Sequence, residues 1–483
     1  MSDVKAKKDL IYVHAVVIIA FMFLFRFIPA PAPITSYGMQ VLGVFIGLLY
    51  GWCVAGNLIW PSLLAIAAMA TTDYGGGMAV VGSLFSNASV TMIIFGSFLM
   101  GPISESGVGD WLMAKMLSTK LVAGKPWRIT LMLVLGLYLL SLVVLNQILI
   151  LLLVMAILPG TLRAAGYTPQ DKYPNMLMMG IAIGQLMSIM AYPFMGVALM
   201  PIGTMYAATG LSIDIMKWML AVIPWSIVAL IGYVLLMKLM GCDASKMADI
   251  SSGELREKAA QKLTPYQRAS FIATVMLIVG CVIISFGSAI PFFASFSVYG
   301  WMVLLPGLMM IIKVEGKPLL TTKMITDSFP WELFLCLASA MFVAGQLTAE
   351  GTGIGILLGG LLGSFYGAVG EYMFLVICGI LALVLTNFLN NLAIFMTFVT
   401  VFCSLYMQGI LVDINTAVIA ASLFGCLGFV APSGSVQGAM AHSFEFTSPK
   451  TYYLVGIPSI AYLCVTYVVL PTTLKLHDLG YVI

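Results

Sequence analysis

The stretch Leu385–Phe395 reads LTNFLNNLAIF and places three asparagines, Asn387, Asn390 and Asn391, inside an otherwise apolar run. In a hydrocarbon environment, each amide that lacks a hydrogen-bond partner costs several kcal/mol. Something must offset that cost, so the stretch indicates a helix break, an ion, a ligand or a partner helix. We expect the chain to be organised around this run.

A weaker copy of the same pattern lies upstream, in Leu140–Gln147, which reads LSLVVLNQ. In each copy a hydroxyl residue precedes an asparagine by five positions: Ser141 precedes Asn146, and Thr386 precedes Asn391. The two copies are separated by 245 positions. This spacing predicts two structurally related halves, each with a polar point inside an apolar segment.

The composition indicates a membrane protein. Of the 483 residues, 61% are hydrophobic and 8% are charged, and the mean hydropathy is +1.07. Soluble domains carry about 25% charged residues, and an apolar fraction this large could not be covered by a polar surface. Because one membrane helix needs about 20 apolar residues, the chain has room for around a dozen segments and is predicted to be an all-α polytopic membrane protein.

Two apolar runs, Ile129–Leu158 and Tyr372–Met407, are too long for one crossing of about 30 Å and too short for two crossings with a loop. Each is therefore predicted to form a re-entrant hairpin, at residues 129–160 and 372–408, with its polar tip near mid-membrane. Non-helical backbone is tolerated at that depth only where it is buried in protein or lines a wet cavity.

The distribution of positive charge favours this arrangement. With a cytoplasmic N-terminus and two hairpins, all but Arg26, Lys217 and Lys475 of the 22 lysines and arginines fall on the cytoplasmic side. The prediction is about 11 transmembrane helices plus two hairpins, with the C-terminus outside. The hairpins then enter from opposite faces, as an inverted-topology repeat requires, and Glu105 and Glu350 provide a third pair at the same separation.

Each predicted hairpin is followed by an apolar segment with a proline- and glycine-containing interruption, AYPFMG at 191–196 and GFVAPSGS at 428–435. Proline lacks an N–H group and glycine loosens a helix, so both segments are predicted to unwind midway. Unwound carbonyls can ligate a cation, and half-helix N-termini can face an anion. Ordinary proline kinks are the alternative. The predicted organisation is an N-terminal helix (1–30), a first repeat (31–240, broken helix 175–207), a cytoplasmic linker (241–267) and a second repeat (268–475, broken helix 417–439).

The polar residues of the two tips offer neutral oxygens, which are hard ligands suited to Na⁺. The alternative is interhelical hydrogen bonding worth about 1 kcal/mol, which is sufficient for Asn387. Acidic residues fall near the predicted ends of segments, which argues against a proton relay through buried carboxylates. His14 and His442 are isolated, and we expect structural roles for both.

Sequence signatures of other function classes are missing. There is no GxxxxGK[ST] phosphate loop, no HExxH or clustered His/Cys set, and no GxSxG. We therefore expect no enzymatic activity, no cofactor and no metal other than Na⁺ as coupling ion. A membrane protein without transport activity would not need paired polar tips. The eight cysteines form no CxxC and are expected to be packing residues.

At three places the chain resembles the divalent anion/Na⁺ symporter (DASS) family of the ion-transporter superfamily. Pro31–Thr35, before an apolar run that ends at Gly51-Trp52, resembles the start of that family. Phe329–Glu332 resembles the entry to its second hairpin region, and Thr386–Asn391 resembles the segment with its Ser-Asn-Thr signature. Both signature threonines are replaced, by Gln147 and Leu392. The residues that the family uses for sodium are therefore better matched here than those that it uses for the substrate.

The resemblance implies roles for individual residues. The implied Na⁺-site residues are Ser141, Asn146, Ala191, Thr386, Asn391 and Val430; the implied substrate-binding residues are Asn146, Gln147, Tyr192, Asn390, Asn391, Ala431 and Pro432.

The predicted function is secondary active transport: Na⁺-coupled symport of a small organic or divalent, carboxylate-type anion. The alternative is an exporter or ion/H⁺ antiporter of the same superfamily with a non-dicarboxylate substrate. The resemblance further implies an elevator mechanism and a homodimer. The expected location is the cell inner or plasma membrane, in contact with lipid, and no nucleic-acid partner is expected.

Overall fold

The computed structural model describes residues 2–54, 58–86, 90, 94–95, 97–98, 100–108, 111–112, 115, 125–144, 147–193, 196–213, 215–249, 260–286, 291–329, 331–347 and 349–476. Within these residues the protein is built from helices, with one small antiparallel pair of strands, β1 (Lys313–Val314) and β2 (Lys317–Pro318). The predicted all-α class is confirmed. Asn146 lies outside the described residues, as do residues 194–195 of the first interruption and residues 250–259 of the predicted linker.

The first half contains α1 (Ser2–Ile19), η1 (Ala20–Leu24), η2 (Phe25–Phe27), α2 (Ser36–Val54), α3 (Ile59–Met69), α4 (Gly77–Ser86), α6 (Met100–Ser106), α8 (Pro126–Leu131), η3 (Met132–Gly136), α9 (Leu137–Val144), α10 (Gln147–Ala164), α11 (Lys172–Ile189), η4 (Gly196–Ala198), α12 (Leu199–Thr209) and α13 (Ile215–Leu239). The second half contains η5 (Ser245–Asp249), α15 (Pro265–Phe286), α16 (Pro291–Ile311), α17 (Thr322–Ser328), α18 (Trp331–Leu347), η6 (Glu350–Thr352), α19 (Ile354–Thr386), α20 (Asn391–Met407), α21 (Ile414–Gly425), α22 (Val436–His442) and α23 (Pro449–Leu476).

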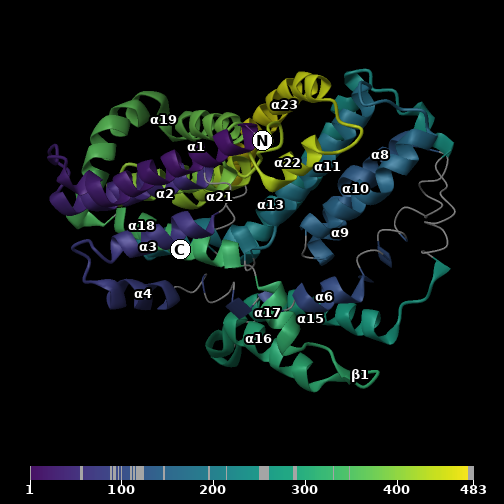
Figure 1. Ribbon diagram of the computed structural model, residues 1–483, viewed down its shortest axis with the longest axis horizontal. Helices are drawn as coiled ribbons and strands as arrows, with labels where there is room; N and C mark the ends of the chain where they lie inside the picture. Colours follow the sequence, from purple (N-terminus) through teal and green to yellow (C-terminus); the bar gives the residue numbers. More distant parts are fainter. Residues whose placement is uncertain are drawn as a thin grey trace.

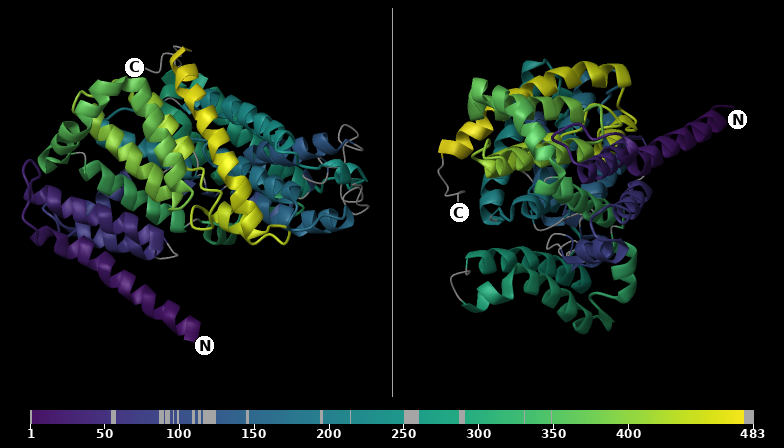
Figure 2. Two further views of the ribbon diagram at one scale, coloured as in Figure 1. Left: turned by 90° about the horizontal axis from the view of Figure 1, so that it is seen from above. Right: turned by 90° about the vertical axis from the view of Figure 1, so that its left-hand side faces the viewer.

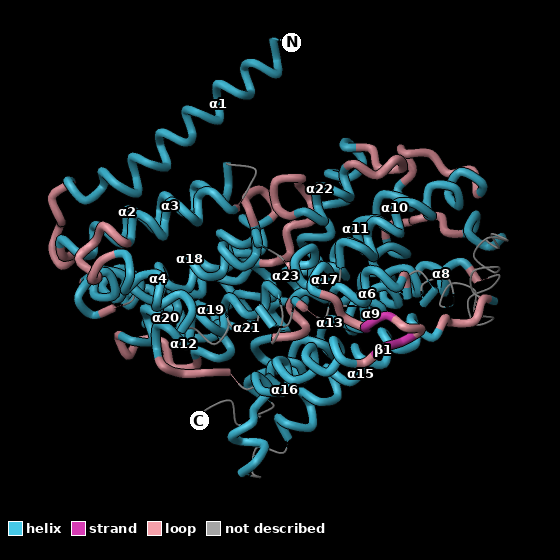
Figure 3. Tube along the Cα trace, turned by 60° about the horizontal axis from the view of Figure 1, so that its bottom comes forward, coloured by secondary structure: helices cyan, strands magenta, loops and turns pink. Residues whose placement is uncertain are grey.

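The helices form three groups (Figure 1). Helices α2, α3 and α18 pack together with α1 beside them, and α1 extends away from the body in Figures 2 and 3. Helices α15, α16 and α17 gather with α6 and the β1–β2 hairpin at one side of the molecule. The central group holds α9–α13 and α19–α23, and it contains both interrupted segments.

Helix α11 lies at the centre of this last group. Its residues from Tyr173 to Ser188 are buried, and it packs against α9, α10, α13, α22 and α23. A helix that is apolar on all sides is stable where other elements or lipid cover its faces, and for α11 the cover is other helices. Helix α11 is thus enclosed between α9, α10 and α13 of the first half and α22 and α23 of the second half.

Five described helices are long and apolar enough to cross a membrane by length and composition: Ser36–Val54, Pro126–Val143, Ile215–Leu239, Ile354–Thr386 and Pro449–Val468. Shorter apolar helices accompany them, including Asn391–Met407 and Ile414–Gly425. Large apolar side chains are exposed on the outer faces, among them Leu239 at 85% and Ile457 at 70%. Exposed apolar side chains of this size are stable in contact with lipid. Their exposure fits a polytopic membrane protein.

Candidate functional site

The second of the two long apolar runs is divided by its asparagines. Helix α19 bends at Gly370, where φ is 76°, and ends at Thr386, and α20 begins at Asn391 and packs back against α19. Asn387 Nδ2 donates to Leu383 O at 2.7 Å, so it satisfies a carbonyl of the last turn of α19. Asn390 Oδ1 accepts from the first amides of α20, Leu392 N at 2.9 Å and Ala393 N at 3.4 Å. We call residues 386–391 the second tip.

The apolar segment that follows α20 is also interrupted, between α21 and α22. Helix α21 ends at Gly425, and α22 starts only at Val436, capped by Ser435 Oγ, which accepts from Gly438 N at 2.9 Å. The same hydroxyl donates to Gly428 O at 2.5 Å and holds the intervening chain in a compact loop. We call residues 426–435 the second break.

The second tip packs directly against the second break through their backbones. A Cβ added at Gly428 or at Gly434 would lie 2.7 Å from Thr386 O, so only glycine allows this approach. Asn391 N donates to Gly434 O at 2.9 Å across the same contact. The two glycines of the GFVAPSGS motif therefore set how closely the tip sits on the break.

Both predicted ion-site residues of the tip turn toward the end of α21. Thr386 Oγ1 donates to Gly425 O at 2.6 Å, and Asn391 Nδ2 donates to Cys426 O at 3.3 Å. Both carbonyls lie at the C-terminal end of α21, and Cys426 O also accepts from Gly428 N at 2.9 Å. The structure therefore brings Thr386 and Asn391 to one place, although they lie on opposite sides of the tip.

These hydrogen bonds leave lone pairs available on Thr386 Oγ1, on Asn391 Oδ1 and on Gly425 O. A hydroxyl can ligate a cation only through a lone pair, so its hydrogen must be donated elsewhere, as that of Thr386 is to Gly425 O. Asn391 is oriented by its Nδ2 bond, and among the described residues no donor contacts its Oδ1. Neutral hydroxyl, amide and carbonyl oxygens are a donor set that suits a hard monovalent cation. The described residues contain no cluster of His, Cys, Asp and Glu that could hold a metal ion.

Both main-chain polar groups of Val430 are hydrogen-bonded to side chains. Its N–H donates to Asn387 Oδ1 at 2.9 Å, and its carbonyl accepts from His442 Nε2 at 2.6 Å. A carbonyl oxygen has two lone pairs, so one stays available beside the histidine bond. The adjacent substrate-site candidates differ in burial: Ala431 is 7% exposed, Pro432 is exposed and Asn390 is half-buried.

The first tip is described only in part. Ser141 on α9 is fully buried, and its Oγ lies 2.8 Å from Leu137 O and 2.5 Å from Gln185 Oε1. Gln147 is the half-buried first residue of α10. Ala191 and Tyr192 follow the end of α11 and are buried. No hydrogen bond joins Ser141 to Ala191 among the described residues; its hydroxyl has Leu137 O of the same helix and Gln185 Oε1 of α11 as acceptors.

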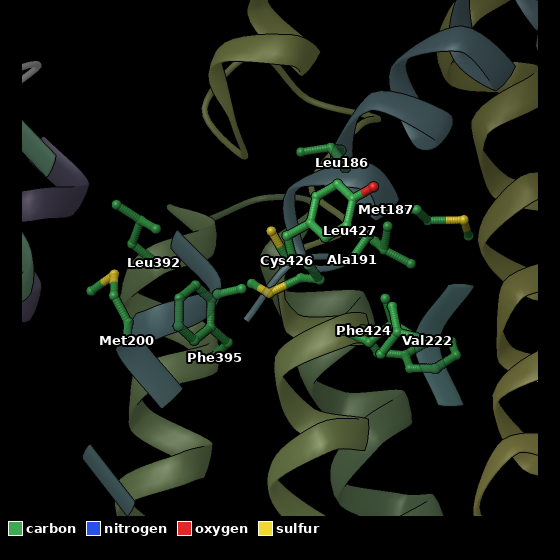
Figure 4. Close-up of a cluster of buried hydrophobic side chains, with 14 of the residues drawn as sticks. Leu186, Met187, Ala191, Met200, Val222, Leu392, Phe395, Phe424, Cys426 and Leu427 are labelled. Atoms are coloured by element: carbon green, nitrogen blue, oxygen red, sulfur yellow. The ribbon is translucent and has the colours of Figure 1, made fainter. Parts of the chain in front are cut away.

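The two interrupted segments meet in one apolar cluster (Figure 4). Ala191 of the first lies with Cys426 and Leu427 of the second, between Leu186 of α11 and Phe395 of α20. Phe395 also packs on Gly425, where an added Cβ would lie 2.6 Å from Phe395 Cβ. The two breaks are thus adjacent at the centre of the protein, far from each other in sequence.

The family of the chain follows from comparison with known proteins. The family described as the sodium:sulfate symporter transmembrane region matches residues 8–474, nearly the whole chain. The chain belongs to the sodium:sulfate symporter family. No curated protein matches the chain.

Membership in the sodium:sulfate symporter family confirms the predicted DASS relationship and a multi-pass membrane transporter. It implies sodium-coupled anion symport, with Na⁺ as coupling ion and lipid as the environment. The family is one of transporters and not of enzymes.

Three polar residues around the symporter's tips were missed or assigned only ordinary roles from sequence. Asn387 is fully buried and holds two amides of the second break, Phe429 N at 3.0 Å and Val430 N at 2.9 Å. Gln185 was detectable as an amide inside an apolar segment. His442 carried no usable signal, because its partner is a backbone carbonyl twelve residues upstream.

Proposed function

We propose that this chain is a Na⁺-coupled symporter of a small organic or divalent anion of the carboxylate type. The observation that carries the proposal is the convergence of Thr386 and Asn391 on the carbonyls of Gly425 and Cys426. Convergence of neutral oxygens from a hairpin tip and a broken helix is the arrangement that secondary transporters use for coupling ions. Ser141 with Gln185 supplies a related buried pair in the first half.

The second tip and the second break lack charged side chains, and this supports coupling between the binding of the ion and the binding of the anion. Residues 386–391 and 426–435 contain no lysine, arginine, aspartate or glutamate. An anion that enters this part of the protein would lack a compensating side-chain charge, which is costly in a poorly hydrated site. A bound Na⁺ supplies that charge, so each ligand raises the affinity of the other by the same factor.

The anion would lie against the exposed side of the second tip and break. Helix α20 starts at the tip, and the positive end of its dipole favours negative charge. Asn390 uses its Oδ1 for the helix cap, which directs its amide nitrogen away from α20. Gln147, Tyr192, Ala431 and Pro432 are the further residues proposed to line this site, together with Asn146.

Transport is proposed to proceed by an elevator motion in a homodimer, with a cytoplasmic N-terminus. Tip and break are joined by both side-chain and backbone bonds, which favours their movement as one unit. Helices α2, α3 and α18 pack together and would be the fixed part, and the packing of α18 on α12 would be the surface at which the motion takes place.

Uptake of a radiolabelled dicarboxylate, and of sulfate, into proteoliposomes with and without an inward Na⁺ gradient tests the proposal. We expect Na⁺-dependent uptake of at least one anion that is lost in Asn146→Ala and Asn391→Ala. The control is Gln170→Ala, which removes an exposed amide away from both tips. Uptake unaffected by both asparagine substitutions would contradict the proposed site, and proton flux independent of Na⁺ would favour the exporter or antiporter alternative.

A further inference from the structure

The dipeptide Phe429–Val430 in the second break has all four of its main-chain polar groups bonded to side chains. Asn387 Oδ1 accepts from Phe429 N at 3.0 Å and from Val430 N at 2.9 Å. Tyr452 OH donates to Phe429 O at 3.0 Å, and His442 Nε2 lies 2.6 Å from Val430 O. Because a carbonyl only accepts, the histidine ring carries its hydrogen on Nε2 in this bond.

The three side chains come from three different elements: Asn387 follows α19, His442 ends α22 and Tyr452 belongs to the first turn of α23. Asn387 and Tyr452 are fully buried. The imidazole ring of His442 lies 4.7 Å from the ring of Tyr452, centroid to centroid, so the two donors also position each other.

Buried backbone outside a helix needs partners for its amides and carbonyls, and most such groups find them in other backbone. Here side chains supply every partner, so the direction of each carbonyl depends on three specific residues. Helix α23 approaches closely enough because of Gly456, where an added Cβ would lie 2.8 Å from Val430 Cγ1. The orientation of Val430 O is therefore set from outside the break.

We propose that His442 and Tyr452 are positioning residues for the second sodium site: through their bonds to Val430 O and Phe429 O they fix the carbonyl direction that the ion meets. This inference rests on the proposed function, and it takes Val430, which the family resemblance implies as a Na⁺-site residue, as a sodium ligand. One lone pair of Val430 O is occupied by His442, and the other is directed by that bond.

The test measures the sodium concentration that gives half-maximal uptake, together with the midpoint of thermal unfolding. Tyr452→Phe and His442→Leu each remove one donor to the dipeptide. Loss of one such bond corresponds to a rise in the half-saturating sodium concentration of about fivefold to tenfold. His442→Gln keeps an N–H donor, and we expect it to stay within about twofold of the unmodified protein.

Tyr467→Phe is the matched control. It lies on the same helix α23, is buried, and loses the same kind of bond, from its OH to Leu375 O of α19 at 2.6 Å; its ring packs on Phe424 of α21. We expect it to lower the unfolding midpoint and leave the sodium dependence unchanged. The inference is overturned if Tyr452→Phe and His442→Leu match Tyr467→Phe in sodium dependence, or if His442→Gln is as impaired as His442→Leu. Absence of any sodium response in the unmodified protein would overturn the symport proposal itself.

Discussion

Replacement of Asn387 by leucine tests how the second break is held in place. The side chain is fully buried, and its Oδ1 is the acceptor for Phe429 N and Val430 N. Leucine has a similar volume and no acceptor, so both amides would remain buried without a partner. A buried donor left unsatisfied costs about 1–3 kcal/mol, which gives a loss of about 2–6 kcal/mol for the pair.

The comparison variant is Asn390→Ala, three residues further along the same tip. Asn390 is half-buried and caps α20, and loss of an N-cap costs about 0.5–2 kcal/mol. Thermal unfolding of both purified variants in detergent, without ligand, gives the two shifts under identical conditions. We expect the midpoint for Asn387→Leu to fall at least about twice as far as that for Asn390→Ala.

An equal or smaller shift for Asn387→Leu would refute the reasoning, because it would mean that the break relaxes to other partners at no cost. Asn387→Asp sharpens the comparison. It keeps an oxygen acceptor for both amides but loses the donation to Leu383 O and adds a buried charge. We expect it to be destabilised as well, and to recover in part at acidic pH, where the carboxyl group is neutral.

Three further predictions concern the two tips. Thr386→Val removes the hydroxyl that bonds Gly425 O, and we expect the half-saturating sodium concentration in uptake assays to rise about tenfold, whereas Thr386→Ser stays within about threefold. Gly428→Ala places a Cβ 2.7 Å from Thr386 O and should abolish uptake, whereas Gly360→Ala, with no atom within 4 Å, should be tolerated; equal activities would contradict the close packing. Gln185→Leu removes a partner of the Ser141 hydroxyl and should lower stability by about 1 kcal/mol, measured by thermal unfolding; an unchanged midpoint would refute the pairing.

The helical class followed from the sequence, because it depends on local chemistry. Asparagines in hydrocarbon and the Pro/Gly motif at 428–435 mark places where a helix is costly to continue, and α19 and α21 end at those places. The bend at Gly370 falls just before the predicted hairpin at 372–408. The family relationship was likewise readable from the tip motifs.

The hydrogen-bond partners of the tip residues could not be predicted from local sequence patterns. Sequence reasoning explained Asn387 by ordinary interhelical bonding and regarded His442 as an isolated residue, whereas in the structure both hold the same dipeptide. A hydrogen bond between a side chain and a distant backbone group leaves no periodicity, spacing or composition signal. The carbonyl of Val430 was proposed as a ligand, but its bond to His442 depends on how α22 folds back.

By itself, the sequence determined that this chain is an all-α membrane protein, because hydropathy is a property of each segment, and it predicted two polar tips that are each followed by a broken helix. Only the tertiary structure decided that the tip at Thr386–Asn391 closes onto the carbonyls of Gly425 and Cys426. That contact depends on two glycines whose missing side chains let backbones approach across 42 and 48 positions of sequence. Such proximity results from packing, which no local pattern encodes.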